Sequence, residues 1–160
     1  MTDYLPLLER LHDAGAQFIV IGGVAGIIHG AARVTYDTDI LYARSPANLR
    51  AIVAALAPLT PYPRGAPPGL PFLFDARTLQ AGLNFTFSTT AGDIDLLGAV
   101  DGIGPYENAI VHAAWIKVSG KRVAVLSLID LIAAKRAAGR PKDFEAIAEL
   151  EILRDAIENR

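Results

Sequence analysis

The stretch IVIGGVAGIIHGAARVTYDTDILYA, residues 19–43, carries the strongest structural signal in this sequence. Its apolar beginning predicts a buried strand over QFIVIG (17–22), and GVAGIIHGA (23–31) predicts a short helix directly after it. A second strand is expected at DTDILYA (37–43). A pair of glycines therefore stands at a strand-to-helix turn, and the motif Asp-x-Asp begins the next strand.

The glycine pair and the acidic residues together indicate phosphate chemistry. Glycines at such a turn allow backbone amides to approach a phosphate, and the helix N-terminus adds partial positive charge. Asp37 and Asp39 are two residues apart, so both carboxylates project from one face of a strand and can bind divalent cations. Asp93 and Asp95 repeat this geometry on a later strand, where a third carboxylate can help to polarise an attacking hydroxyl. The sequence thus predicts a phosphate cradle beside a metal site.

Each of these features also has an ordinary explanation. A glycine pair after a strand is often a plain tight turn, and acids at strand ends are commonly solvated or capping. A dinucleotide-binding site is a further alternative, since Asp37 or Asp39 lies near the roughly 20-residue offset of a ribose-binding acid. It is disfavoured because residues 22–26 lack the G-x-G-x-x-G spacing and because the acids precede their apolar run. The conjunction of the features favours the metal site.

The rest of the sequence predicts further helices and two hairpins. We expect helices near 5–15, at 46–59, at 127–139 and from Pro141 onward, hairpins over 83–100 and 114–127, and a mobile loop in PYPRGAPPGLP (61–71). The terminal helix carries an apolar stripe of Phe144, Ile147, Leu150, Leu153 and Ile157. Trp115 is expected in the core, whereas Tyr36 and Tyr42 flank the acidic strand and could reach a nucleobase.

The composition narrows the class of protein. A length of 160 residues with 52% hydrophobic residues predicts a single domain, residues 1–160, with ample material for a core. No apolar stretch is long enough to span a bilayer, and the first residues carry acids where a signal peptide carries basic residues, so we expect a cytoplasmic protein with no membrane partner. The absence of cysteine leaves carboxylates and three histidines as metal ligands, which favours Mg²⁺ or Mn²⁺.

The charge is distributed unevenly around a net value of −2. Seven basic residues and one acid lie between Lys117 and Lys142, whereas residues 143–160 hold six acids and two arginines. The basic stretch could contact the phosphates of a nucleic acid. The alternative is a solvated helix face that complements the acidic last helix, and charge alone leaves both open.

The pattern apolar-Gly-Gly, then Asp-x-Asp-apolar, then a lone strand carboxylate resembles the polymerase-beta-type nucleotidyltransferase superfamily. GGVAGIIHGAARVTYDTDI, in which Arg33 and Thr35 precede the acids, is especially similar to bacterial abortive-infection type nucleotidyltransferases, many of which are toxins of toxin–antitoxin systems. The resemblance covers residues 17–97 and, more loosely, LIDLIAAKRAAGRPKD (128–143). It implies an α+β nucleotidyltransferase fold, with a mixed central β-sheet flanked by helices and a C-terminal helix pair.

The resemblance also implies roles for individual residues. Asp37 and Asp39 would bind two magnesium ions, and Asp95 would be the third catalytic and metal-binding acid. Gly22 and Gly23 would hold the triphosphate of the nucleoside triphosphate. The implied activity is the Mg²⁺-dependent transfer of a nucleoside monophosphate from a nucleoside triphosphate to a hydroxyl acceptor.

The C-terminal part of the resemblance adds two residues and bears on the partners. Lys135 would contact phosphates, and Asp143 would border the site. We rank RNA, such as a tRNA end, first as the acceptor, and expect a toxin with a cognate antitoxin or with self-association. The alternative function is a catalytically silent nucleotidyltransferase-fold binding module, an antitoxin or regulator that binds its partner through the terminal helix.

Overall fold

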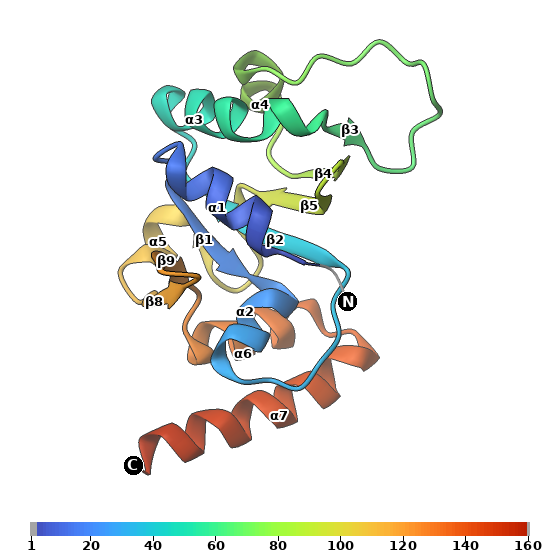
Figure 1. The fold of residues 1–160 in the computed structure, drawn as a ribbon. Coiled ribbons are helices and arrows are strands. Elements are labelled where there is room, and N and C mark those ends of the chain that lie inside the picture. The colour runs from blue at the N-terminus through green and yellow to red at the C-terminus, as the bar shows by residue number, and fades with distance from the viewer. Residues whose placement is uncertain (1–2, 160) are drawn as a thin grey trace.

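The computed structural model describes residues 3–159, in which seven strands form one mixed β-sheet (Figure 1). These strands are β1 (Phe18–Ile21), β2 (Asp37–Tyr42), β3 (Tyr62–Pro63), β4 (Phe85–Thr89), β5 (Gly92–Leu97), β8 (Ala114–Val118) and β9 (Lys121–Val125). Their order in the sheet is β3-β4-β5-β2-β1-β9-β8, with β1 parallel to β9, β2 parallel to β5 and the other neighbours antiparallel. β6 (Ala99–Val100) and β7 (Gly104–Pro105) pair in a separate sheet. The predicted mixed sheet is confirmed.

Helices flank this sheet. They are α1 (Leu5–Asp13), α2 (Gly22–His29), α3 (Pro46–Leu56), α4 (Ala76–Ala81), α5 (Tyr106–Ile110), α6 (Leu128–Ala138) and α7 (Pro141–Glu158), with a short 3-10 helix at Ala57–Leu59. In Figure 1, α1, α3 and α4 gather toward one end of the molecule and α2, α6 and α7 toward the other. The predicted C-terminal helix pair is present, since α6 packs against α7. None of the described helices is long and apolar enough to cross a membrane.

The central strands β1 and β2 are deeply buried. All four residues of β1 are buried, and Ile40 and Leu41 of β2 have no exposed surface. Tyr42 is also fully buried, and its hydroxyl donates a hydrogen bond of 2.7 Å to the carbonyl oxygen of Leu83. Complete burial of one aliphatic side chain contributes about 1.5–3 kcal/mol to stability. The acids at the start of β2 are therefore carried by a firmly anchored strand.

Local signals in the sequence explain where the C-terminal elements begin and end. Ser127 caps α6, because its side chain accepts a hydrogen bond from the amide of Asp130, and Gly139 ends that helix with φ 64°. The hairpin β8–β9 turns at Ser119 and Gly120, which both have positive φ, as a type I′ turn requires. The predicted helix at 127–139 and the predicted hairpin over 114–127 are confirmed.

Several short elements differ from the sequence prediction. Residues 62–63 form the edge strand β3 inside the segment expected to be a loop, and proline is tolerated there because an edge strand leaves one side of its backbone unpaired. The unpredicted helix α4 begins after Asp75, whose side chain accepts a hydrogen bond of 2.8 Å from the amide of Thr78. The unpredicted α5 has only five residues, too few to show a helical period.

The apolar stripe of α7 is only partly buried, and the expectation that Trp115 lies in the core is wrong. Ile147 and Leu150 of α7 are buried, but Phe144, near the start of the helix, is 62% exposed, and Ile157, near its end, is 48% exposed. The C-terminal end of α7 extends away from the sheet (Figure 1), which accounts for the exposure of Ile157. Trp115 is 53% exposed instead of lying in the core. It belongs to β8, which is an edge strand and therefore has a neighbouring strand on one side only.

Candidate active site

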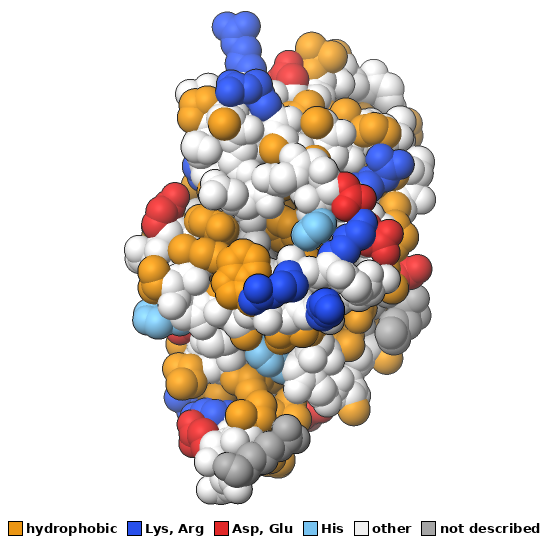
Figure 2. All heavy atoms as spheres, turned by 60° about the vertical axis from the view of Figure 1, so that its left-hand side comes forward, with side chains coloured by type: hydrophobic (Ala, Val, Ile, Leu, Met, Phe, Trp, Pro, Cys, Tyr) orange, Lys and Arg blue, Asp and Glu red, His pale blue; other side chains and the backbone are white. Residues whose placement is uncertain are grey.

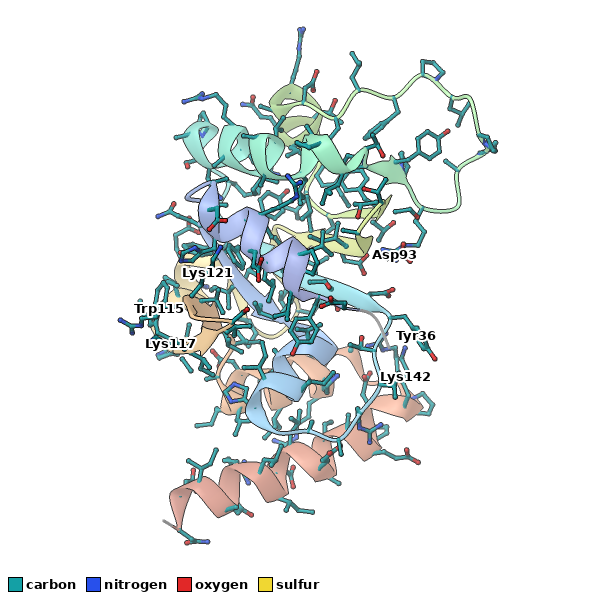
Figure 3. The ribbon with its side chains drawn as sticks, viewed as in Figure 1. Tyr36, Asp93, Trp115, Lys117, Lys121 and Lys142 are labelled. Atoms are coloured by element: carbon teal, nitrogen blue, oxygen red, sulfur yellow. The ribbon has the colours of Figure 1, made fainter. Side chains whose placement is uncertain are left out.

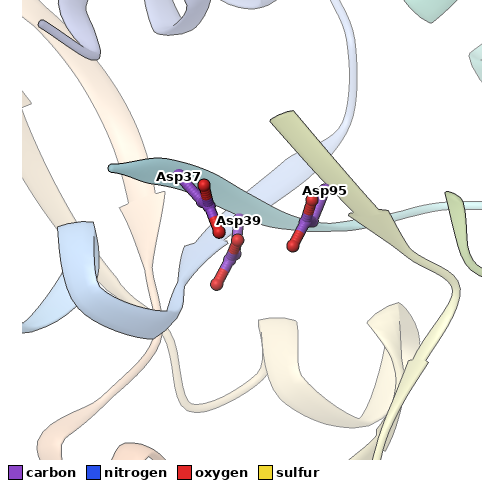
Figure 4. A group of neighbouring side chains, drawn as sticks. All are labelled: Asp37, Asp39 and Asp95. Atoms are coloured by element: carbon purple, nitrogen blue, oxygen red, sulfur yellow. The ribbon is translucent and has the colours of Figure 1, made fainter. Parts of the chain in front are cut away.

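Asp37, Asp39 and Asp95 converge on one face of the sheet (Figure 4). β2 and β5 pair in parallel, so that Asp37 lies opposite Asp93 and Asp39 lies opposite Asp95. Because side chains alternate along a strand, these four carboxylates leave the sheet on the same side. One carboxylate oxygen from each of Asp37, Asp39 and Asp95 lies within 4.8 Å of the others. The structure thus brings together the three acids selected from the sequence, and we call them the triad.

The oxygens of the triad fit a divalent cation. Mg²⁺ and Mn²⁺ prefer carboxylate oxygens, and the triad offers one such atom from each residue. Oδ1 of Asp39 is buried, and no hydrogen-bond donor among residues 3–159 reaches it. A buried oxygen without a partner is costly, and a cation among the three carboxylates would satisfy it. The donor set and the unpaired oxygen both suit a hard metal ion.

Asp39 stands in surroundings that disfavour its negative charge. Burial raises the pKa of the Asp39 carboxyl from 3.8 to about 7, and the carboxylates of Asp95 and Asp37 add to this shift, whereas the Arg64 guanidinium opposes it. A strongly perturbed acid beside a cavity is characteristic of functional sites. Near pH 7, the folded protein therefore gains from a positive charge placed next to Asp39.

Gly22 makes the close approach of α2 to Asp39 possible. Its φ is 64°, and a Cβ atom at this position would lie 2.3 Å from Oδ2 of Asp39. A Cβ atom at Gly23 would lie 2.8 Å from Oγ1 of Thr35. Both glycines open α2, whose first backbone amides have no acceptor within the helix and carry partial positive charge. The positive end of α2 therefore lies directly beside the triad.

A cavity of about 470 Å³ adjoins the triad. Its wall combines polar and apolar groups and includes Gly22, Asp39, Leu97, Leu131, Lys135 and Arg140. Burial lowers the pKa of the Lys135 ammonium, while the nearby Asp143 and Asp39 carboxylates favour its charged form. The structure therefore places Lys135, which was selected from the sequence, on the same cavity as Asp39 of the triad.

Arg64 is the residue of this site that sequence reasoning missed. It follows β3, and its guanidinium forms ion pairs with Asp37 (3.8 Å), Asp93 (3.3 Å) and Asp95 (2.6 Å). The single positive charge of Arg64 thus forms ion pairs with carboxylates on both β2 and β5. The only signal in the sequence is that Arg64 is the sole charged residue of PYPRGAPPGLP (61–71).

Comparisons with known proteins bear on the fold. The sequence matches no known protein family and no curated protein. The structure is similar to the crystal structure of a protein from Thermotoga maritima that is provisionally designated a nucleotidyltransferase, with a TM-score of 0.54 and 13% sequence identity over 100% of this chain and 97% of that chain. This chain has a nucleotidyltransferase fold. The predicted fold class is confirmed. Because one fold can host many functions, the function of this protein depends on the side chains of its site.

Asp143, which was expected to border the site, and two residues between β1 and β2, Arg33 and His29, hold parts of the fold together. Asp143 is buried and accepts hydrogen bonds from the backbone amide (3.1 Å) and Nε (2.8 Å) of Arg140, which lowers the pKa of Asp143 and caps α7. Nε of Arg33 lies 2.9 Å from Glu149 and ties the segment before β2 to α7. Nε2 of His29 lies 2.8 Å from a backbone carbonyl oxygen between β9 and α6.

Proposed function

We propose that this protein is a metal-dependent nucleotidyltransferase, which transfers a nucleoside monophosphate from a nucleoside triphosphate to a hydroxyl group and releases pyrophosphate. The observation that carries the proposal is the triad, whose carboxylate oxygens lie within 4.8 Å of one another beside the start of α2. A second support is the adjoining cavity of about 470 Å³, which has the size of a small-molecule site.

The triad would hold the metal. Asp37 and Asp39 offer oxygens from β2, and Asp95 offers one from β5. A Mg²⁺ or Mn²⁺ held by these residues would neutralise charge on the triphosphate and make the α-phosphorus easier to attack. Coordination of that cation would satisfy the buried, unpaired Oδ1 of Asp39, which favours tight binding.

The chain's own groups would bind the nucleotide and move the proton. Backbone amides at Gly22 and Gly23 donate hydrogen bonds to phosphate oxygens at the N-terminus of α2, and Lys135 contributes positive charge from the cavity wall. Asp95 accepts the proton of the attacking hydroxyl. The new bond joins the acceptor oxygen to the α-phosphorus, the bond from that phosphorus to the bridging oxygen breaks, and pyrophosphate leaves with the electron pair.

RNA, such as a tRNA end, is the acceptor that we rank first. The basic stretch between Lys117 and Lys142 supports a polyanionic substrate over a protein hydroxyl or a small molecule. The resemblance of residues 22–40 to bacterial abortive-infection type nucleotidyltransferases supports a cytoplasmic toxin with a cognate antitoxin, built as one domain over residues 1–160.

The proposal is tested by measuring the melting temperature with Mg²⁺ and each nucleoside triphosphate. A ligand that binds the native state alone adds roughly 2.7 kcal/mol at a hundredfold excess over its dissociation constant. We expect an upward shift with both components, little shift with nucleotide alone, and loss of the shift in Asp37→Asn. Glu145→Gln, which removes an exposed acid from α7, is the matched control. Incubation with α-labelled nucleoside triphosphates and cell extract then identifies the labelled acceptor, and label in a fraction other than RNA would contradict the ranking.

A catalytically silent binding module is the second candidate, and Arg64 favours it. An arginine that already neutralises Asp95 at 2.6 Å leaves less negative charge for a metal. In that case a partner chain would cover the exposed apolar residues of α7, among them Phe144 and Ile152, which are 62% and 70% exposed. A protein without Mg²⁺-dependent nucleotide binding that forms a tight complex with a neighbouring gene product would belong to this class.

A further inference from the structure

Trp115, Lys117 and Arg122 form a second cluster of functional side chains, on the hairpin β8–β9. In the register of this hairpin, Trp115 lies opposite Ala124 and Lys117 lies opposite Arg122. Because strand residues alternate, the three side chains share one face of the sheet. Figure 3 shows Trp115 and Lys117 together on the outer strand, well away from Asp93. We call these three residues the edge cluster.

The edge cluster presents an aromatic ring with a cation against it. Trp115 is 53% exposed, and the guanidinium carbon of Arg122 lies 6.0 Å from the centre of its ring. Both residues line a hollow of about 400 Å³, together with His12, Gln17 and Tyr106. Figure 2 shows basic side chains gathered around hydrophobic ones on this side of the molecule. The Trp115 ring, which lies beside the hollow and the Arg122 guanidinium, can stack against another planar group.

Within residues 3–159, the charges of the edge cluster have no acidic partner. Lys117 and Arg122 stand directly opposite each other, and two like charges in that position destabilise a strand pair. Across residues 3–159, neither side chain has an acidic partner within 4.0 Å, whereas their neighbour Lys121 lies 2.6 Å from Asp13. A bound anion would remove the repulsion.

We propose that the edge cluster binds single-stranded RNA, with one base stacked on Trp115 and adjacent phosphates contacting Lys117 and Arg122. An aromatic platform flanked by cations is the usual composition of a site for single-stranded nucleic acid. The choice of RNA rests on the acceptor ranked first for the proposed function. A peptide that extends the sheet edge would bind through the backbone of β8 and would not require these three side chains.

The position of the edge cluster suits a substrate-holding site. Arg122 lies two strands away from β2, and the strand register places its Cα roughly 16 Å from that of Asp39. The two sites therefore share no residue. One RNA molecule bound at the edge cluster would stay near the triad, which raises the local concentration of its reactive end.

Trp115 is the only tryptophan of the chain, so its fluorescence reports on the edge cluster alone. The experiment titrates a short oligouridylate into the 160-residue protein at low salt without divalent metal. We expect saturable quenching, because a base stacks on the indole. The affinity should fall as salt rises, with a log–log slope of about −0.7 for each phosphate contacted.

Variants separate stacking from general charge. Binding of dye-labelled oligouridylate, followed by anisotropy, should weaken roughly tenfold or more in Trp115→Ala and stay close to the parent in Trp115→Phe. Lys117→Gln and Arg122→Gln should each reduce the salt slope. Arg50→Gln, which removes an exposed arginine on α3, should change neither quantity, and melting temperatures check that each variant is folded.

Distinct results would overturn this proposal or the proposed function. The edge cluster is not an RNA site if oligouridylate fails to quench Trp115, if Trp115→Ala binds as well as the parent, or if single-stranded DNA of the same length binds more tightly. Binding lost in Lys135→Gln but kept in Arg122→Gln would place the RNA at the cavity and overturn the second site. Failure of Mg²⁺-dependent nucleotide binding, with RNA binding intact, would remove the proposed enzyme and leave the edge cluster standing.

Discussion

Nη2 of Arg64 donates a hydrogen bond of 2.6 Å to Oδ1 of Asp95, and so the segment after β3 is tied directly to the third acid of the triad. The same nitrogen donates to the carbonyl oxygen of Phe87 at 3.2 Å, which fixes the guanidinium against β4. The Arg64 side chain is 29% exposed, so its ion pairs are only partly screened by solvent. A metal ion at the triad would therefore compete with the Arg64 guanidinium for the same carboxylates.

Removing that counter-charge is expected to have opposite effects on metal binding and on stability. Arg64→Gln should bind Mg²⁺ roughly fivefold more tightly, in line with about 1 kcal/mol for a partly exposed ion pair. Without metal its melting temperature should fall, because Asp37, Asp93 and Asp95 lose their shared cation. Isothermal calorimetry and thermal unfolding measure both effects, with Arg77→Gln on α4 as the control. Weaker Mg²⁺ binding would mean that Arg64 orders the carboxylates for the metal.

Asp39→Asn should abolish transfer and stabilise the metal-free protein. The folded-state pKa of Asp39 is about 7, above the unfolded value of 3.8, so the folded state holds the proton more tightly. The contribution of Asp39 to stability is therefore greatest below about pH 4 and declines as the pH rises to about 7. Asparagine removes this decline, which amounts to a difference on the order of 2–4 kcal/mol above pH 7. Denaturant unfolding at several pH values measures it, and a less stable Asp39→Asn at pH 8 would make Asp39 a scaffold residue.

Gly22→Ala should damage the triad as well as the backbone. The new Cβ atom would lie 2.3 Å from Oδ2 of Asp39, so the carboxylate has to move, and the positive φ adds strain. Gly15→Ala is the matched control, since Gly15 has φ 73° with nothing within 4 Å of the added atom. Both variants should lose roughly 1–2 kcal/mol from backbone strain. We expect only Gly22→Ala to lose more than this and to bind Mg²⁺ weakly, and equal behaviour of the two would mean that the contact with Asp39 is unimportant.

Lys135→Gln should weaken nucleotide binding without unfolding the protein. Burial already disfavours the Lys135 ammonium, so its removal costs little stability, whereas the triphosphate loses a positive charge on the cavity wall. We expect roughly tenfold weaker binding of the nucleoside triphosphate at constant Mg²⁺ affinity. Lys142→Gln, an exposed lysine at the start of α7, is the control. A parallel loss in both variants would indicate a general charge effect.

The part of the fold that the sequence predicts well is the part with local signals. The apolar run at residues 17–22, the glycines after it and the alternation around Asp37 and Asp39 each reflect the immediate surroundings of the backbone. The period of two residues along a strand placed Asp93 and Asp95 on one face, and the family resemblance then selected Asp95. The acids therefore meet where the sequence analysis expected them.

The features that escaped prediction depend on long-range pairing. Arg64 reaches the triad only because Tyr62 and Pro63 pair with β4, more than twenty residues further along the chain. Trp115 is exposed because β8 is an edge strand, and no local pattern states which strand lies at an edge. Because aromatic residues are buried on average, the residue type favoured a buried Trp115, and that prediction was wrong.

Because β2 and β5 pair in a fixed register, the candidate site depends on whether an insertion or deletion in β5 has an odd or an even number of residues. Losing one residue just before Asp95 would turn its carboxylate toward the apolar side of the sheet and present a neighbouring apolar residue in its place. A shift by two residues in the other sense would set Asp93 opposite Asp39 and still supply an acid. Near the β4–β5 turn, an insertion of two residues should therefore be tolerated, whereas an insertion or deletion of one residue should not.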